Sequence, residues 1–142
     1  MVKPLYEVTV ISNGGRDGKV FSEDNTFYQD LAVPKEMGGN GVTESNPEQL
    51  FAAGYSSCFN NALMHILKND GKGSIEPEVR ATAYLLPDKT DGGVKLAAEL
   101  DVTVKDLNQE EAELYVKKAH NYCPYSKALK ETIDIEINVS VN

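Results

Sequence analysis

Residues 46–69, NPEQLFAAGYSSCFNNALMHILKN, are the stretch that decides the fold. Asn46 is a good helix N-cap, Pro47 suits the first helical position, and Gln49 can complete a capping box. The first half of the predicted helix is apolar or small on almost every side, and a helix without a polar face is usually buried all round. A single chain of 142 residues has difficulty surrounding such a helix, so we expect the protein to dimerise.

Strand and helix patterns continue on both sides of this central helix. Before it, three segments read as strands: residues 5–11, 20–21 and 26–33. After it come strands at 79–86 and 94–105, a helix at 109–121 that Asn108 caps, a short helical turn from Cys123, and a strand at 133–141. Strands, a buried helix, more strands and a second helix predict an α+β fold, and no domain boundary is evident within residues 1–142.

The spacing of apolar residues predicts which face is buried in one strand and in one helix. In the second strand after the central helix, residues of one face alternate with polar ones. These are Val94, Leu96, Ala98, Leu100, Val102 and Val104. In the second helix, the predicted inward stripe consists of Ala112, Tyr115, Val116 and Ala119.

Charge and targeting signals narrow the range of functions. The chain has 22 acidic and 14 basic residues, hence a formal net charge of −8. Such a surface repels nucleic acid and anionic lipid, so neither is an expected partner. The N-terminus lacks an apolar run of signal-peptide length, and no segment is long enough to span a membrane. We therefore expect a cytoplasmic protein.

The two cysteines, Cys58 and Cys123, carry the first chemical information. Reducing compartments rarely keep structural disulfides, so such a pair is either reactive, metal-binding or simply buried. Free cysteine often behaves as a small core hydrophobe. Composition alone leaves both the reactive and the inert interpretations open.

Cys58 cannot be activated by its own helix. It lies three turns after the cap at Asn46, and the effect of the helix dipole fades within the first turn. Burial alone raises a thiol pKa, so a reactive Cys58 needs a cation from elsewhere. Arg16, in the turn GGRDG at 14–18, is the candidate, although most arginines in turns only decorate a hairpin. Glu48 either complements the helix dipole or holds a guanidinium through a bidentate pair.

Helix geometry restricts how Glu48 and Cys58 can cooperate. They are ten residues apart, or about 15 Å along a straight helix axis. Either the helix kinks near Gly54, or Glu48 serves the Cys58 of a neighbouring subunit. We favour the second arrangement because the helix is apolar on almost every side.

Cys123 precedes Pro124 and takes the N-cap position of a new helical turn, where backbone N–H groups favour a thiolate. Ser, Thr, Asn or Asp would cap better, which argues against a purely structural cysteine.

A metal site is the competing use of these thiols. Cys58 and His65 are seven residues apart, about 10.5 Å along the helix, which is too far to share a zinc ion. The remaining set of Cys58, Cys123 and His120 has few ligands, so we expect no metal, and we expect His120 to be a packed or surface residue.

Several of these segments together resemble a known family. Residues 46–55, NPEQLFAAGY, followed by Cys58-Phe59, resemble the central-helix signature of the OsmC-like family. The segment around Cys123, with Ala119-His120 before it and Pro124-Tyr125-Ser126 after it, resembles the second-cysteine motif. Residues 31–36 (LAVPKE) and the turn at 14–16 also match, and together they are similar to the organic hydroperoxide resistance (Ohr) branch rather than to OsmC proper. The resemblance covers nearly the whole chain.

The resemblance implies an intertwined homodimer with an OsmC-like fold and two active sites at the subunit interface. It implies a thiol peroxidase that reduces alkyl or fatty-acid hydroperoxides, with Cys58 as the peroxidatic thiol and Cys123 as the resolving thiol. Arg16 and Glu48 match the arginine and glutamate that activate the thiolate. The implied electron donor is a dihydrolipoyl dithiol on a lipoylated protein, and no cofactor or metal is implied.

The chain departs from the family pattern at the polar pairs Ser56-Ser57 and Asn60-Asn61, where small apolar residues are frequent. This difference affects the expected polarity of the pocket and hence the choice of substrate. The alternative to a peroxidase is a non-catalytic redox-sensing or ligand-binding domain of the same family. The chain shows no DNA-binding element, which argues against a direct transcriptional sensor.

Overall fold

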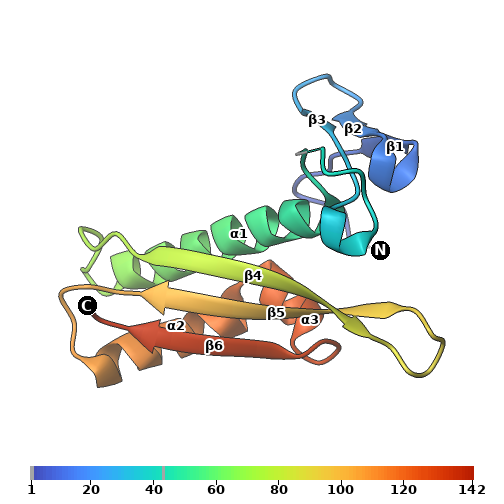
Figure 1. The fold of residues 1–142 in the computed structure, drawn as a ribbon. Coiled ribbons are helices and arrows are strands. Elements are labelled where there is room, and N and C mark those ends of the chain that lie inside the picture. Colours follow the sequence, from blue (N-terminus) through green and yellow to red (C-terminus); the bar gives the residue numbers. More distant parts are fainter. Residues whose placement is uncertain (1, 43) are drawn as a thin grey trace. The chain divides into compact units, whose positions relative to one another are not determined.

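The computed structural model describes residues 2–42 and 44–142 (Figure 1). The chain divides into two compact units, one up to Leu50 and the other from Phe51 to Asn142, and each is described here by itself. The mixture of strands and helices confirms the α+β prediction. Among the described residues, no helix is both long enough and apolar enough to cross a membrane. That residues 1–142 form one domain stays a prediction.

The N-terminal unit is built on a three-stranded antiparallel sheet. Its strands are β1 (Val10–Asn13), β2 (Lys19–Ser22) and β3 (Tyr28–Asp30), in that order. Ile11 of β1 lies opposite Phe21 of β2, so the hairpin is in register through its middle. Arg16 lies in the turn that connects β1 to β2.

The first and third strands are shorter than the sequence predicts. The apolar run at 5–11 suggested a strand from Leu5, but β1 begins only at Val10. The reason is that β2 ends at Ser22, so no strand of the described chain lies opposite residues 5–8. Leu5 is fully exposed and Tyr6 is 79% exposed. Beyond β3, the predicted strand to residue 33 continues only as an isolated bridge between Leu31 and Ser45.

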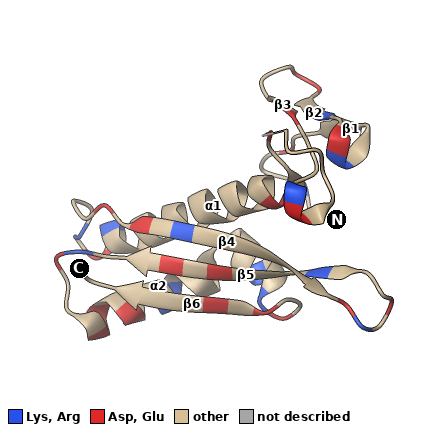
Figure 2. Ribbon diagram, in the orientation of Figure 1, with Lys and Arg blue, Asp and Glu red and all other residues tan. Residues whose placement is uncertain are grey.

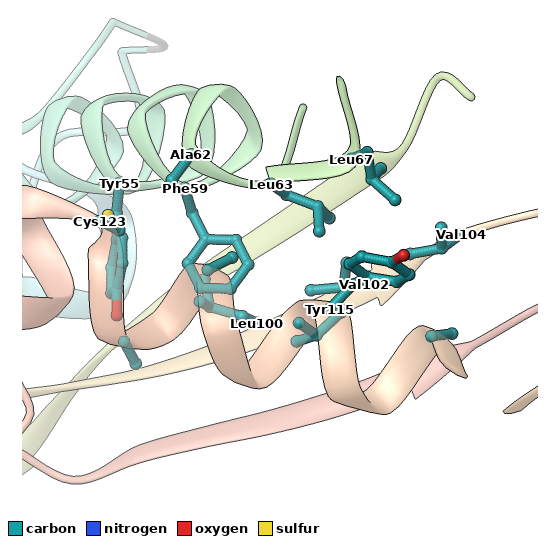
Figure 3. Close-up of a cluster of buried hydrophobic side chains, with 14 residues drawn as sticks. Tyr55, Phe59, Ala62, Leu63, Leu67, Leu100, Val102, Val104, Tyr115 and Cys123 are labelled. Atoms are coloured by element: carbon teal, nitrogen blue, oxygen red, sulfur yellow. The ribbon is translucent and has the colours of Figure 1, made fainter. Parts of the chain in front are cut away.

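Helix α1 (Pro47–Asn69) has the bounds that the sequence predicts. The side-chain carbonyl of Asn46 accepts a hydrogen bond from the backbone N–H of Gln49 at 2.8 Å, which confirms the N-cap. One face of the helix is buried, through Tyr55, Phe59, Ala62, Leu63 and Leu67 (Figure 3). The prediction of burial on all sides is wrong within one chain. Ala53, Ser57 and Met64 are exposed, because the other elements cover only one side of α1.

The C-terminal unit contains a second sheet of β4 (Glu78–Pro87), β5 (Val94–Thr103) and β6 (Ile135–Ser140). β4 and β5 form an antiparallel hairpin, whereas β5 and β6 are parallel. A parallel pair needs a long crossover. Helices α2 (Gln109–Tyr122) and α3 (Pro124–Leu129) lie in this crossover. Figure 1 shows α1 and α2 on the same face of this sheet.

The core of the C-terminal unit lies between these helices and the sheet. The predicted inward stripe of α2 is buried and consists of Ala112, Tyr115, Val116 and Ala119. Asn108 caps this helix, because its side-chain oxygen accepts a hydrogen bond from the backbone N–H of Glu111 at 2.8 Å. Along β5, the predicted face is buried from Ala98 onward, while Val94 is 56% exposed because it lies at the far end of the hairpin. Each of the three strands of the sheet carries charged residues or, in β6, a single one (Figure 2). Cys123 is fully buried within the core cluster.

Candidate functional site

Arg16 lies in a 3₁₀ turn, Gly15–Asp17, between β1 and β2. Gly14 has φ of +85°, in the left-handed region that favours glycine. A Cβ on Gly18 would overlap with the backbone carbonyl of Asn13. Glycine at both positions therefore permits the tight turn that sets the direction of the Arg16 side chain.

Glu48, in the first turn of α1, holds Arg16 by a two-point ion pair. Nη1 of Arg16 donates to Oε2 of Glu48 at 2.8 Å, and Nη2 donates to Oε1 at 2.6 Å. The hydrogen bond from Arg16 lowers the pKa of Glu48, and the same contact raises the pKa of Arg16. Both groups are therefore charged at neutral pH. The bidentate pair confirms the interpretation that Glu48 holds a guanidinium. It also shows that the Arg16 side chain has a specific partner and is not merely exposed at the tip of a hairpin.

The two cysteines lie next to each other in the C-terminal unit. The thiol of Cys123 donates to Sγ of Cys58 at 3.7 Å, although the residues are 65 apart in the chain. Cys58 projects from α1 and is partly buried, and Cys123 is the single residue between α2 and α3. Cys123 occupies the predicted N-cap position, yet its side chain makes no cap hydrogen bond to the helix. Its thiol is turned to Cys58 instead.

The surroundings of Cys58 within this unit do not activate it. Burial raises the pKa of the Cys58 thiol, and the hydrogen bond and charge of Cys123 raise it further. The backbone N–H of Tyr125 acts in the opposite direction and lowers this pKa, but it does not outweigh burial. This direction agrees with the sequence argument that Cys58 needs a cation from elsewhere in order to react.

Gly54 has a packing role that the sequence did not suggest. A Cβ at this position would lie 2.5 Å from the hydroxyl oxygen of Tyr125 and 3.1 Å from its Cζ. The Tyr125 ring stacks on the ring of Tyr55, with centroids 5.9 Å apart and planes 20° apart. The absent side chain of Gly54 thus lets α3 approach α1 near the two sulfurs.

The polar pairs around Cys58 are largely turned toward the backbone. The hydroxyl groups of Ser56 and Ser57 donate to the carbonyl of Ala53, at 3.2 Å and 2.8 Å. The amide of Asn60 donates to the carbonyl of Pro77 at 3.1 Å. Backbone bonding of this kind reduces the polarity that Ser56 and Ser57 offer to a ligand. The side-chain oxygen of Asn60 is buried and has no hydrogen-bond partner among the described residues.

A buried hydrogen-bond chain beside the cysteines was missed at the level of sequence. Ser126 is fully buried, and its hydroxyl lies 2.7 Å from the hydroxyl of Tyr55 and 2.9 Å from Nδ1 of His120. The only signal in the sequence is that Ser126 follows Cys123 by three residues, the spacing of neighbours on one helix face. Of the two expected placements of His120, packed or at the surface, the structure shows a partly buried, hydrogen-bonded residue.

The second histidine lies apart from this chain. The ring of His65 stacks on Tyr122 with centroids 5.2 Å apart, and its Nε2 lies 3.3 Å from the amide of Asn69. Within residues 2–42 and 44–142, no three His, Cys, Asp or Glu side chains are grouped to hold a metal ion.

Comparison with known proteins decides the family. The family model described as OsmC-like protein matches residues 38–138. The chain belongs to the OsmC-like family. It is 88% identical to the organic hydroperoxide resistance protein-like 2 of Staphylococcus saprophyticus, over all 142 residues and the full length of both chains.

Solved structures support the same branch of the family. An organic hydroperoxide resistance protein of Legionella pneumophila is similar with a TM-score of 0.90 and 42% identity, over 98% of this chain and 100% of that one. OhrB of Bacillus subtilis is similar with a TM-score of 0.86 and 38% identity, over 96% and 99% of the two chains. These similarities confirm the predicted fold and the resemblance to the organic hydroperoxide resistance branch.

Proposed function

We propose that the protein is a thiol peroxidase that reduces alkyl or fatty-acid hydroperoxides to alcohols. The observation that carries this proposal is the pair of free thiols 3.7 Å apart, contributed by segments 65 residues apart in a chain of the organic hydroperoxide resistance branch. A sulfur–sulfur bond is about 2.05 Å long, so the two sulfurs are close enough for a disulfide to form after a small approach.

The proposed reaction begins at Cys58. Its thiolate attacks the distal oxygen of the hydroperoxide, the O–O bond breaks, and the alkoxide leaves and takes up a proton to become the alcohol. Cys58 is then a sulfenic acid, the reversible first stage of cysteine oxidation. The thiol of Cys123 attacks the oxidised sulfur, a disulfide forms and water leaves. A dihydrolipoyl dithiol then reduces this disulfide by thiol exchange and becomes a cyclic disulfide itself.

In this proposal Arg16 supplies the cation that Cys58 needs. Burial raises the pKa of Cys58, and a guanidinium near the sulfur would lower it by stabilising the thiolate. The Arg16 side chain is 36% exposed despite its contact with Glu48, so its remaining N–H donors are accessible to a second anion. Glu48 holds the guanidinium in place through both carboxylate oxygens.

We propose further that the protein is a homodimer in which Arg16 and Glu48 of one subunit serve Cys58 of the other. Helix α1 is uninterrupted from Pro47 to Asn69, and its rise separates Glu48 from Cys58 by about 15 Å along the axis. Exposed apolar side chains support an association between chains, notably those of Leu5, Tyr6 and Met64. The lipoylated donor and a cytoplasmic location complete the proposal.

Steady-state consumption of an organic hydroperoxide with dihydrolipoamide, run beside hydrogen peroxide, tests the activity. Turnover should be much faster with the organic substrate, and Cys58→Ser should abolish it. Cys123→Ser should allow one turnover followed by over-oxidation of Cys58. Oxidation of one equivalent without turnover in the wild-type protein would instead support a non-catalytic redox sensor.

Mixed dimers test the composite site. A Cys58→Ser chain mixed with a Glu48→Ala chain forms one intact site if Glu48 acts across the dimer, and activity should recover to about half of the wild-type value per mixed dimer. The reciprocal control mixes wild-type chains with chains carrying both substitutions, and that dimer should have no intact site. The opposite pattern, recovery only in the control, would show that Glu48 acts within its own chain.

A further inference from the structure

A chain of hydrogen bonds, fully buried at Tyr55 and Ser126 and partly buried at His120, joins three helices beside the two thiols. It runs from Tyr55 on α1 through Ser126 on α3 to His120 on α2, over O···O and O···N distances of 2.7 and 2.9 Å. The side chains of Tyr55 and Ser126 have no exposed surface. None of the three takes part in the reaction proposed above.

Proton counting fixes the direction of this chain. Among the described residues, the Tyr55 hydroxyl has one hydrogen-bond partner, Ser126, so its buried proton is satisfied only if it donates to Ser126. The Ser126 proton must then go to the remaining partner, Nδ1 of His120. His120 is therefore neutral, with a bare Nδ1 and its proton on Nε2. A protonated imidazole would carry N–H at Nδ1 and would leave one buried O–H without an acceptor.

The electrostatic surroundings of His120 favour the same form. Burial lowers the pKa of His120, and the charge of Lys130 at the end of α3 lowers it further. A lowered pKa means that the neutral imidazole predominates at neutral pH, as the chain requires.

The chain connects the elements that carry the two sulfurs. Tyr55 precedes Cys58 by three residues on α1, and Ser126 follows Cys123 by three residues. Side chains three apart lie on the same side of a helix. A bond between Tyr55 and Ser126 therefore sets how the start of α3 lies against α1, and with it the distance of 3.7 Å between the sulfurs.

We propose that His120 is a positioning residue for the disulfide-forming step: its bare Nδ1 ends the hydrogen-bond chain that holds Cys123 against Cys58. This inference rests on the proposed function to the extent that Cys58 and Cys123 form a disulfide. It assigns to His120 no contact with the hydroperoxide and no role in forming the sulfenic acid.

The first test is spectroscopic. In the reduced protein, the ¹⁵N shifts of the His120 ring should show an unprotonated Nδ1 and a protonated Nε2. Ser126→Ala should shift the Nδ1 resonance, whereas the His65 ring, which lies outside the chain, should be unchanged. A His120 ring with its proton on Nδ1 would overturn the proposal.

The second test measures disulfide formation with the general thiol oxidant diamide, so that it does not depend on peroxidase activity. His120→Leu removes the acceptor and should slow closure of the Cys58–Cys123 disulfide about ten-fold, because small displacements of reacting groups reduce rates steeply. His120→Asn places an amide oxygen near the position of Nδ1 and should restore most of the rate. His65→Leu is the matched control and should close at the wild-type rate.

The outcomes separate the two proposals. Equal closure rates in His120→Leu and the wild-type protein would refute the positioning role, even if hydroperoxide turnover is observed. Slow closure in His120→Leu with rescue by His120→Asn would support it, even if the protein fails to turn over any hydroperoxide. If His120→Leu does not fold, Tyr55→Phe replaces it, since that change removes the first donor and keeps the ring, and an unchanged closure rate would count against the proposal.

Discussion

Substitution of Gly54 by alanine tests whether the close approach of α3 to α1 is as the structure shows. The new Cβ would lie 2.5 Å from the hydroxyl oxygen of Tyr125, 3.1 Å from Cζ and 3.3 Å from Cε2, whereas ordinary contacts begin at 3.4 Å. The tyrosine hydroxyl must therefore move by about 0.9 Å, the difference between 3.4 and 2.5 Å. Its ring cannot move toward Tyr55, on which it stacks, so it must swing outward, and we expect the start of α3, which carries the ring, to shift with it.

The size of the effect follows from two opposing contributions. Replacement of glycine by alanine inside a helix stabilises by roughly 0.5–1 kcal/mol. Overpacking of a close contact costs about 1–3 kcal/mol. We therefore expect Gly54→Ala to lower the free energy of unfolding by about 1 kcal/mol, and to slow disulfide formation because the start of α3 carries Cys123.

A double-mutant cycle with Tyr125→Phe isolates this contact. Phenylalanine lacks the hydroxyl that lies 2.5 Å from the added Cβ and leaves the next atom at 3.1 Å. In that background, Gly54→Ala should be neutral or slightly stabilising, which gives an interaction energy of about 1 kcal/mol. Urea unfolding of the four proteins at one fixed protein concentration measures it. The same effect of Gly54→Ala in both backgrounds would refute the proximity of the Tyr125 ring to Gly54.

Three further predictions address other parts of the chain. Leu63→Ala removes a fully buried side chain of α1 and should cost about 3 kcal/mol in urea unfolding; Met64→Ala, at an exposed neighbour, should cost much less, and equal costs would contradict the assigned core face. The pKa of Asp24 is lowered to about 2, chiefly by the hydrogen bond from the Ser22 hydroxyl. The ionised Asp24 carboxylate therefore stabilises the fold above about pH 4, and this stabilisation is lost as the pH falls through about 2. An NMR titration of Asp24 with a midpoint near 3.8 would contradict this prediction. Arg16→Lys keeps the charge but loses the bidentate ion pair, so hydroperoxide turnover should fall by about ten-fold or more, and wild-type turnover in this variant would argue against a role for the guanidinium geometry.

Local signals in the sequence were enough to predict the helices. Asn46 and Asn108 both accept the hydrogen bonds that their positions suggested, and both helices have the expected bounds within about a residue. Caps and helical periodicity depend on residues a few positions apart, so they are visible without knowledge of the fold. The strand expected from Leu5 failed for the opposite reason. Its residue types are typical of a strand, but a strand also needs a partner strand, which lies elsewhere in the sequence.

The candidate site shows the same division between local and distant information. The inference that Cys58 needs an external cation followed from helix geometry and stays a prediction. The contact of Arg16 with Glu48, 32 residues away, was only one of two open interpretations. The pairing of the cysteines came from the family resemblance. The bond between Ser126 and His120 escaped notice because a hydroxyl and an imidazole six residues apart carry no pattern that identifies them as partners.

In the proposed reaction, the unequal accessibility of the two cysteines would determine which sulfur of the disulfide the reducing dithiol attacks. Cys123 is completely shielded, whereas Cys58 retains contact with solvent. An incoming dithiol that meets the oxidised pair from solvent therefore reaches the sulfur of Cys58, and Cys123 is the leaving group. The mixed disulfide with the reductant would then form on Cys58 alone. In the reduced protein, a bulky electrophile should modify Cys58 in each chain and leave Cys123 unmodified, and glutathione should form its adduct on the same sulfur.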